Sequence, residues 1–213
     1  MNQKSKTIII LANGSYPKHK IPLQYLSSKN KIIFCDGAIN NLNNKNINPY
    51  KIIGDLDSIS KVCMEKYKDI ITLQSEQNNN DLYKALNWCY NNDYSNIVIL
   101  GASGKRDDHF IGNIFLLFEF TCFLNLKMIT DTGIFIIINK NTIFKSYVNQ
   151  PVSFFAIDNT IKVKTENLKY PLNNTSLKNL FSGTLNVSIS NTFKIDISHG
   201  SLLVFQKHKK NNL

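Results

Sequence analysis

Three features that often reveal a protein's class are absent from this sequence. Its four cysteines, Cys35, Cys63, Cys89 and Cys122, form no Cys-x-x-Cys pair, so no zinc or redox motif of that kind is present. No apolar run reaches the roughly 20 residues that cross a membrane. The run Ile8–Ala12 is too short for the core of a signal peptide. We therefore expect a cytoplasmic protein with reduced, buried thiols and no membrane partner.

A concentrated basic surface is also missing, although the formal net charge is +10. The lysines are scattered, and the densest basic run, Lys207–Lys210, is typical of a solvated tail. No aromatic platform accompanies the charge, so we expect no nucleic-acid partner. A non-catalytic nucleotide- or nucleic-acid-binding module is kept as an alternative. The hydrophobic content of 43% is sufficient for a packed core in 213 residues.

The first part of the chain alternates between strand-like and helix-like patterns. This alternation predicts an α/β domain with a parallel sheet over residues 1–131. Asp81–Asn92 has apolar residues on one helical face, and either Asn79 or Asn80 can cap it. His109–Leu124 is apolar almost all round, which predicts a buried helix. The expected strands are Thr7–Ala12, Lys31–Cys35, Lys51–Ile53, Asn96–Leu100 and Lys127–Thr130.

The pattern changes after Asp131, and only strand-like runs broken by Asn, Pro and Gly follow. We therefore expect a separate all-β domain, a small sandwich, over residues 132–213. Its expected strands are Ile134–Ile138, Val152–Ile157, Ile161–Thr165, Thr184–Ser190, Lys194–Ile197 and Ser201–Gln206.

Small and acidic residues directly follow four of the strands expected in the first domain. Ligands of open α/β sheets bind beyond the carboxyl ends of the strands, so parallel strands would bring these clusters to one rim. Gly- and Asp-rich loops are common in such folds, but four together, two with acids, indicate a site. The clusters are Asn13-Gly14-Ser15, Asp36-Gly37-Ala38, Gly54-Asp55-Leu56-Asp57-Ser58 and Gly101-Ala102-Ser103-Gly104.

Asp55 and Asp57 form an Asp-x-Asp pair of the kind that holds Mg²⁺. Two neighbouring carboxylates repel each other unless a cation lies between them. Ser58 is more simply interpreted as the cap of a following helix. Phosphatases also use such a pair, and one of these is a second alternative. Their aspartates follow the first strand, however, whereas these follow the third.

The segment from Gly101 to His109 offers groups that bind phosphate. Gly101 and Gly104 would let the backbone approach a polyphosphate, and Arg106 would hold phosphate oxygens in a fork. Asp108 and His109 begin the next helix and are interpreted as a pair that shapes a nucleotide pocket.

Gln77 and Asp81 lie on an Asn-rich stretch and at a helix start. One interpretation is a solvated loop with an acid that complements the helix dipole. The other is that the stretch folds over the site, so that both side chains face the substrate.

The ordered set of motifs resembles the thiamine pyrophosphokinase family. The resemblance extends into the second half of the chain, through Leu168–Leu172, Ser190-Asn191 and Gly200–Val204. It implies a Rossmann-like ATP- and Mg²⁺-binding domain, a C-terminal β-sandwich that contributes to thiamine binding and dimerisation, and a homodimer. It also implies transfer of pyrophosphate from ATP to thiamine, giving thiamine diphosphate and AMP.

The resemblance also implies roles for individual residues. Asp55, Asp57 and Asp81 would surround Mg²⁺ and, with Arg106, form the catalytic set. Asp81 would bind metal, orient the alcohol or accept its proton, and the sequence does not decide among these roles. The thiamine side would consist of Gln77 and Asp81 from one subunit with Ser190 and Asn191 from the other. The ATP side would consist of Asn13, Gly14, Asp36, Gly37, Gly101, Gly104, Arg106, Asp108 and His109.

Three positions depart from the family pattern. Glu76 stands in place of an aspartate, and Tyr170 in place of a tryptophan. Lys105 replaces the second glycine of a Gly-Gly-Arg element, where it would either face solvent or add a phosphate contact.

Overall fold

The computed structural model describes residues 7–42 and 47–209, and the chain divides after Asp131 into two compact units. We call residues 1–131 unit 1 and residues 132–213 unit 2. The predicted fold class is confirmed, because an α/β unit with a parallel sheet is followed by an antiparallel β-sandwich. No helix in the described parts of either unit is long and apolar enough to cross a membrane.

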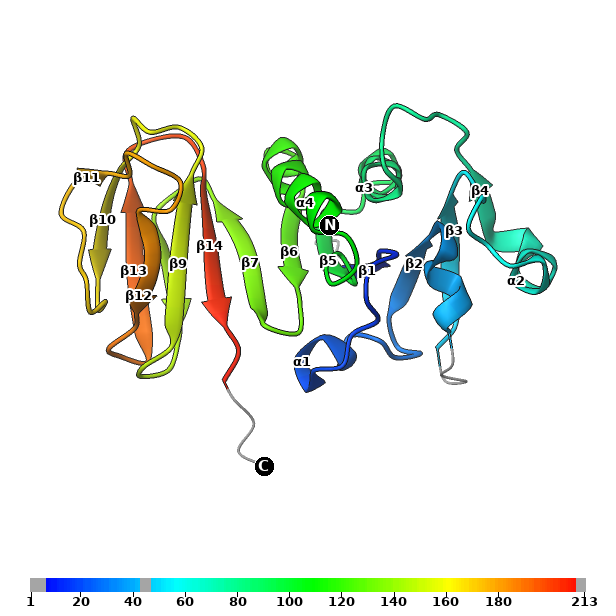
Figure 1. Ribbon diagram of the computed structural model, residues 1–213, viewed down its shortest axis with the longest axis horizontal. Coiled ribbons are helices and arrows are strands. Elements are labelled where there is room, and N and C mark those ends of the chain that lie inside the picture. The colour runs from blue at the N-terminus through cyan, green and yellow to red at the C-terminus, as the bar shows by residue number, and fades with distance from the viewer. Residues whose placement is uncertain (1–6, 43–46, 210–213) are drawn as a thin grey trace, which may run out of the picture. The chain divides into compact units, whose positions relative to one another are not determined.

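Unit 1 is built on a parallel sheet with the strand order β6-β5-β1-β2-β3-β4 (Figure 1). The central strands are short runs of Ile, Leu and Val, and Ile8, Ile9 and Ile10 are fully buried. Burial on both faces is what the unbroken apolar runs predicted. The strands are β1 (Thr7–Leu11), β2 (Lys31–Cys35), β3 (Pro49–Gly54), β4 (Ile71–Leu73), β5 (Asn96–Leu100) and β6 (Asn125–Ile129).

Short helices connect these strands. Asn80 caps α3 (Asp81–Asn91), since its Oδ1 accepts from the backbone N–H of Tyr83 at 2.9 Å. The prediction that Ser58 caps a helix is wrong, because Ser60 caps α2 and Ser58 Oγ donates to Asp57 instead. The other helices are α1 (Lys20–Leu23), α2 (Lys61–Lys66) and α4 (Asp107–Phe120), with 3₁₀ turns η1 (Asp36–Asn41) and η2 (Lys68–Ile70).

Helix α4 differs from its prediction in both bounds and burial. It begins two residues before His109 and ends at Phe120 rather than Leu124. Asn113, Leu116, Leu117 and Phe120 are buried, but Ile111 and Phe115 are at least half exposed. An apolar composition therefore did not mean burial on every side.

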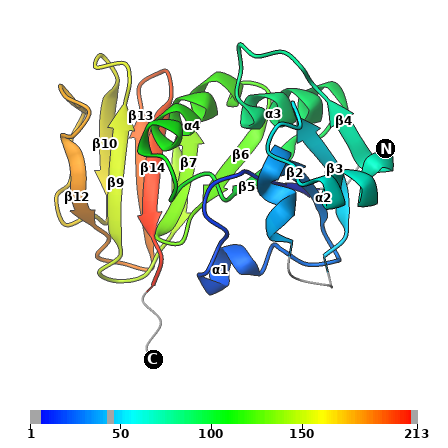
Figure 2. The same cartoon turned by 45° about the vertical axis from the view of Figure 1, so that its right-hand side comes forward.

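Unit 2 consists of two antiparallel sheets, ordered β12-β9-β14-β7 and β11-β10-β13-β8. Neighbouring strands of the first sheet, β9, β14 and β7, are visible side by side in Figure 2. A core of alternating inward residues, including Phe154, Val163, Phe193 and Val204, packs between the sheets. The strands are β7 (Gly133–Ile138), β8 (Thr142–Lys145), β9 (Pro151–Ala156), β10 (Lys162–Glu166), β11 (Thr175–Ser176), β12 (Gly183–Val187), β13 (Thr192–Ile197) and β14 (Leu202–Lys207).

The expectation of a solvated basic tail holds only in part. Lys207 ends β14, where it pairs with Gly133, and His208 is buried. Lys209 is exposed, and Lys210 lies outside the described residues.

Candidate functional site

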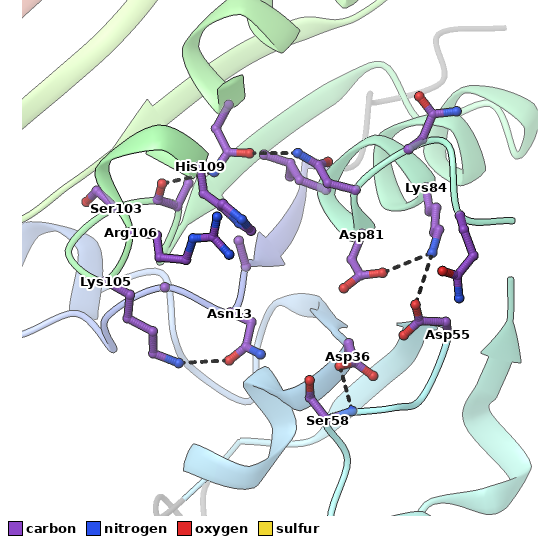
Figure 3. A pocket seen from close by; sticks show the side chains of 18 residues that line it. Asn13, Asp36, Asp55, Ser58, Asp81, Lys84, Ser103, Lys105, Arg106 and His109 are labelled. Carbon is purple, nitrogen blue, oxygen red and sulfur yellow. Dashed lines mark hydrogen bonds and ion pairs between the residues drawn. The ribbon is translucent and has the colours of Figure 1, made fainter. Parts of the chain in front are cut away.

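A cavity of about 400 Å³ lies in unit 1, beyond the carboxyl ends of β1, β2, β3 and β5 (Figure 3). Its size is typical of small-ligand sites. The first turns of α3 and α4 complete its wall. The predicted site residues that line it are Asn13, Gly14, Asp36, Asp55, Gln77, Asp81, Arg106 and His109. Parallel topology thus brings together residues nearly a hundred positions apart in the sequence.

Other predicted site residues flank this cavity or lie elsewhere. Gly101 and Gly104 are outside the lining and adopt positive φ angles, 63° and 88°, so they turn the loop that carries Lys105 and Arg106. Gly37, Asp57 and Asp108 are also outside the lining set, next to residues that belong to it. Ser190 and Asn191 belong to unit 2.

One side of the cavity is acidic. Asp36, Asp55 and Asp57 each offer one carboxylate oxygen, and these oxygens lie within 4.8 Å of one another. Asp36 begins η1 with φ of 42°, a conformation that few non-glycine residues adopt. It packs directly against Gly54, where a Cβ atom would stand 2.7 Å from Asp36 Cβ. Only glycine at the end of β3 therefore leaves room for the Asp36 side chain.

Asp36 also has an unused acceptor. The residue is 1% exposed, and its carboxylate Oδ2 accepts from the backbone N–H of Ser58 at 3.2 Å. Oδ1 is buried and has no hydrogen-bond partner among the described residues. A buried carboxylate oxygen without a partner is costly unless something else satisfies it. Three converging carboxylates with such an oxygen fit a hard divalent cation such as Mg²⁺.

Asp81, which the family resemblance places around the same cation, lies outside these three converging oxygens but shares a lysine with Asp55. Its Oδ1 lies 3.3 Å from Nζ of Lys84, and the same Nζ lies 3.9 Å from Asp55 Oδ2 (Figure 3). Desolvation by burial raises the pKa of the Asp81 carboxyl, and Lys84 acts in the opposite direction. Sequence reasoning missed Lys84, whose one signal is its i,i+3 spacing from Asp81 on α3.

The opposite side of the cavity is basic. Lys105 Nζ donates to Asn13 Oδ1 at 3.1 Å, and Arg106 lines the same wall. Arg106 forms a two-point ion pair with Asp108, and this guanidinium lowers the pKa of Asp108 to about 2. Both side chains are exposed, so water screens the pair. Arg106 can therefore exchange Asp108 for another anion.

Asn113 joins the two sides and was also missed in the sequence. Its Oδ1 accepts from Asn80 Nδ2 at 3.2 Å, and its Nδ2 donates to the carbonyl of Ala102 at 3.0 Å. It therefore links the cap of α3 to the loop after β5. A lone Asn inside an apolar helix was the available signal, because a buried amide needs partners.

In unit 2, Ser190 and Asn191 form the turn before β13. Ser190 is half-buried, and its carbonyl accepts from the hydroxyls of Ser146 and Ser188 at 2.7 and 2.9 Å. The carbonyl of Asn191 accepts from the backbone N–H of Ser146 at 2.8 Å. Tyr170 is 57% exposed. The turn is thus fixed through its backbone, which leaves the Asn191 side chain exposed.

Comparisons with known proteins agree across both units. The family model "Thiamin pyrophosphokinase, catalytic domain" matches residues 23–130, and "Thiamin pyrophosphokinase, substrate-binding domain" matches residues 133–205. The thiamine pyrophosphokinase of Bacillus subtilis is 34% identical over 120 residues, which is 54% of this chain and 55% of that protein. Thiamine pyrophosphokinase 1 of rice is 33% identical over 99 residues, 42% of this chain and 38% of that protein. These alignments span about half or less of the relatives' lengths.

Solved structures show the same fold. The crystal structure of the Bacillus subtilis thiamine pyrophosphokinase has a TM-score of 0.82 at 24% identity, covering 96% of this chain and 100% of that one. The thiamin pyrophosphokinase from Candida albicans gives 0.74 at 18% identity, covering 98% and 95%. None of these matches favours a phosphatase or a non-catalytic binding module. With one family model matching half of the sequence and a second matching most of the rest, this chain belongs to the thiamine pyrophosphokinase family.

Proposed function

We propose that the cavity of unit 1 transfers the pyrophosphoryl group of ATP to the hydroxyethyl oxygen of thiamine, giving thiamine diphosphate and AMP. The observation that carries this proposal is the opposition of charge across one cavity in a chain of this family. Carboxylates that directly follow β2 and β3, together with the one that begins α3, face a basic loop between β5 and α4. A polyphosphate with a divalent cation fits such a cavity, because it presents positive and negative groups together.

The acidic side would hold Mg²⁺ through Asp36, Asp55 and Asp57, whose oxygens converge. A bound Mg²⁺ would neutralise the polyphosphate oxygens and orient them for in-line attack. The residues around the carboxylates keep them in place. Ser58 contributes its backbone N–H to Asp36 and its hydroxyl to Asp57.

The basic side would bind the nucleotide. Arg106 would exchange its exposed partner Asp108 for phosphate oxygens, which a guanidinium fork holds with two hydrogen bonds. Lys105, held beside Asn13, would add a point charge on the same wall. His109 and Asn13 would contact the nucleotide near the start of α4. Gly14 brings the loop after β1 against the loop after β5, its N–H donating to the carbonyl of Gly101 at 2.7 Å.

Thiamine would face Gln77 and Asp81, which line the cavity on the α3 side. Asp81 would orient the attacking alcohol or accept its proton. Support for this role over metal ligation comes from its position outside the converging group and beside Lys84. Burial raises its pKa, which moves a carboxylate toward the behaviour of a general base.

Unit 2 would complete the thiamine site across a homodimer, with Ser190 and Asn191 supplied by the partner subunit. Mixing two inactive variants, Asp81→Asn and Asn191→Ala, tests this directly. If each site uses both subunits, half of the mixed population is heterodimer with one intact site. About a quarter of wild-type activity should then return. No recovery on mixing would mean that each site is built from a single chain. The four unpaired thiols support the expected cytoplasmic location, which stays a prediction.

The decisive experiment is to incubate the protein with ATP, Mg²⁺ and thiamine and to identify the products. AMP and thiamine diphosphate in equal amounts would establish the activity, and EDTA should abolish it. Release of inorganic phosphate without thiamine diphosphate would indicate a phosphatase. Nucleotide binding without products would indicate a non-catalytic module, and binding to RNA or DNA with steep salt dependence would point to nucleic acid.

A further inference from the structure

Lys84 is the least expected side chain of the cavity. Its side chain is 3% exposed, and lysines are rarely buried to this degree without a partner. It lies on α3, one turn after Asp81, and lines the cavity wall. Burying an ammonium group is costly, so its surroundings must supply compensating negative charge.

Two carboxylates supply that charge, and they come from different elements. Lys84 Nζ lies 3.3 Å from Oδ1 of Asp81 and 3.9 Å from Oδ2 of Asp55. Asp55 belongs to the converging acidic group, whereas Asp81 does not. Lys84 is therefore the one described cation that contacts both sets of carboxylates.

We propose that Lys84 is a positioning residue that ties Asp81 to Asp55 and so fixes the acceptor side of the cavity relative to the cation site. This inference rests on the proposed function. Lys84 also provides part of the positive charge that the acidic cluster needs before a divalent cation binds. The cluster can therefore fold in its final geometry, but with weaker attraction for the incoming cation.

If Lys84 has this role, one substitution should raise the affinity for divalent cations and lower turnover. In Lys84→Met, the side chain keeps most of its length and an apolar stem but loses its charge. Divalent cations should bind more tightly, because a repelling charge a few ångströms away has been removed. Turnover should nevertheless fall, since Asp81 loses the partner that orients it. A purely structural lysine predicts neither change, and a phosphate-binding lysine predicts weaker binding of ATP.

The test begins with Mn²⁺ and the full chain without nucleotide, because free Mn²⁺ is counted directly by electron paramagnetic resonance. We expect Lys84→Met to bind Mn²⁺ about tenfold more tightly than wild type. Lys84→Arg keeps the charge and should remain within about twofold of wild type. Lys51→Met is the matched control. Lys51 is a partly buried lysine of the same unit, outside the cavity lining, whose Nζ donates to Thr72 Oγ1 at 3.0 Å. This variant should leave Mn²⁺ affinity unchanged.

The second measurement is steady-state kinetics on the same variants. Lys84→Met should lower kcat at least about tenfold while KM for ATP changes less than about threefold. Lys84→Arg should recover part of kcat. Circular dichroism and thermal unfolding identify variants that fail to fold, and Lys84→Gln then replaces Lys84→Met.

Several results would overturn the inference. Unchanged or weaker Mn²⁺ binding in both Lys84→Met and Lys84→Gln would mean that the ammonium group does not oppose cation binding. A large rise in KM for ATP at normal kcat would make Lys84 a phosphate ligand. If neither wild type nor the variants bind Mn²⁺ up to millimolar concentrations, the acidic group is not a cation site and the inference fails. Tighter Mn²⁺ binding without thiamine diphosphate synthesis by the wild type would reject the proposed function and keep the countercharge role.

Discussion

The two units of this protein distribute their charged groups in different ways. In unit 1, carboxylates from separate elements converge until their oxygens lie within 4.8 Å of one another. In unit 2, charged side chains form separate pairs rather than one cluster, as Lys194 does with Asp196 at 2.8 Å and with Glu166 at 3.5 Å. The buried contact between Gln206 and Gln150 in unit 2 joins two neutral amides.

The difference follows from sheet topology. Parallel strands all end at one edge, so the loops that follow them share one place. Antiparallel strands end alternately at two edges, so polar residues spread over both ends and the outer faces. Bringing like charges together in a folded site costs stability but provides groups that bind a charged substrate. Separated charges cost the fold little. We therefore expect substitutions in unit 1 to change activity more than stability, and the reverse in unit 2.

The substitution Phe154→Ala gives the largest effect and tests the unit 2 half of this comparison. Phe154 is fully buried between the two sheets, so its removal should cost about 3–5 kcal/mol of unfolding free energy. Hydrogen exchange should show lost protection first in β9 and the strands beside it. Phe181→Ala is the matched control, since Phe181 is 73% exposed. Equal losses of protection in β1 and β9 would show that the units do not unfold separately.

Asp81→Asn tests the unit 1 half. We expect kcat to fall at least about a hundredfold, because an amide neither accepts a proton nor carries charge. Thermal stability should change little, since removing a carboxylate whose ionised form burial disfavours is offset by removing a countercharge of the buried Lys84. KM for ATP should change little. Asp69→Asn, at an exposed acid of η2, is the control. Near-normal kcat in Asp81→Asn would contradict the assigned role.

Asn113→Ala sharpens the comparison, because it removes a buried polar link rather than a charge. The Asn80 amide and the Ala102 carbonyl would each lose a partner, at a cost of about 1–3 kcal/mol. Activity should fall as well, because both contacts support the cavity. Asn91→Ala, at an exposed position of α3, should change neither quantity. A loss of stability with full activity would make Asn113 structural only.

The smallest effect concerns Asp158 in unit 2. Hydrogen bonds from Thr160, and then His199, lower the pKa of its carboxyl below the ordinary value of 3.8. A lowered folded-state pKa stabilises the fold above the unfolded-state pKa, and this contribution is lost as pH falls through the folded value. Asp158→Asn should therefore melt slightly below wild type at pH 7, and the difference should shrink as the pH drops below about 4. A difference that persists at lower pH would exclude this cause.

Much of the fold could be predicted from local patterns. The buried strands of unit 1 are unbroken apolar runs, and α3 has one clear apolar face with Asn80 at its cap. Strand β4 was missed because three residues, Ile71–Leu73, are too few to show a period. In unit 2, β8 and β11 were missed, being strands of four and two residues. The exposure of Ile111 and Phe115 depends on which neighbours pack against α4, and composition does not encode this.

The candidate site was predictable where residues follow strands and less so where they lie on helices. Asp36 and Asp55 were found because strand ends mark them. Lys84 was missed because a helical lysine is expected in solvent, and only the fold places it between two carboxylates. Asp81 was expected around the same cation as Asp55 and Asp57; the structure places it beside Lys84, outside the three converging oxygens, and its role stays a prediction. Where α3 brings Asp81 relative to the strand ends depends on how the helix packs, which no spacing rule supplies.

The position of β1 within its sheet has a consequence for how the chain is made. β1 pairs with β2 on one side and with β5 on the other. Some sixty residues separate the end of β2 from the start of β5, which at 5–20 residues per second takes about 3–12 s to synthesise. During that interval β1, a strand of consecutive isoleucines, has one unpaired edge while the chain is still being synthesised. An unpaired edge of this kind can pair with other chains. A nascent chain of this protein is therefore at greatest risk of aggregation after β2 has emerged and before β5 has followed.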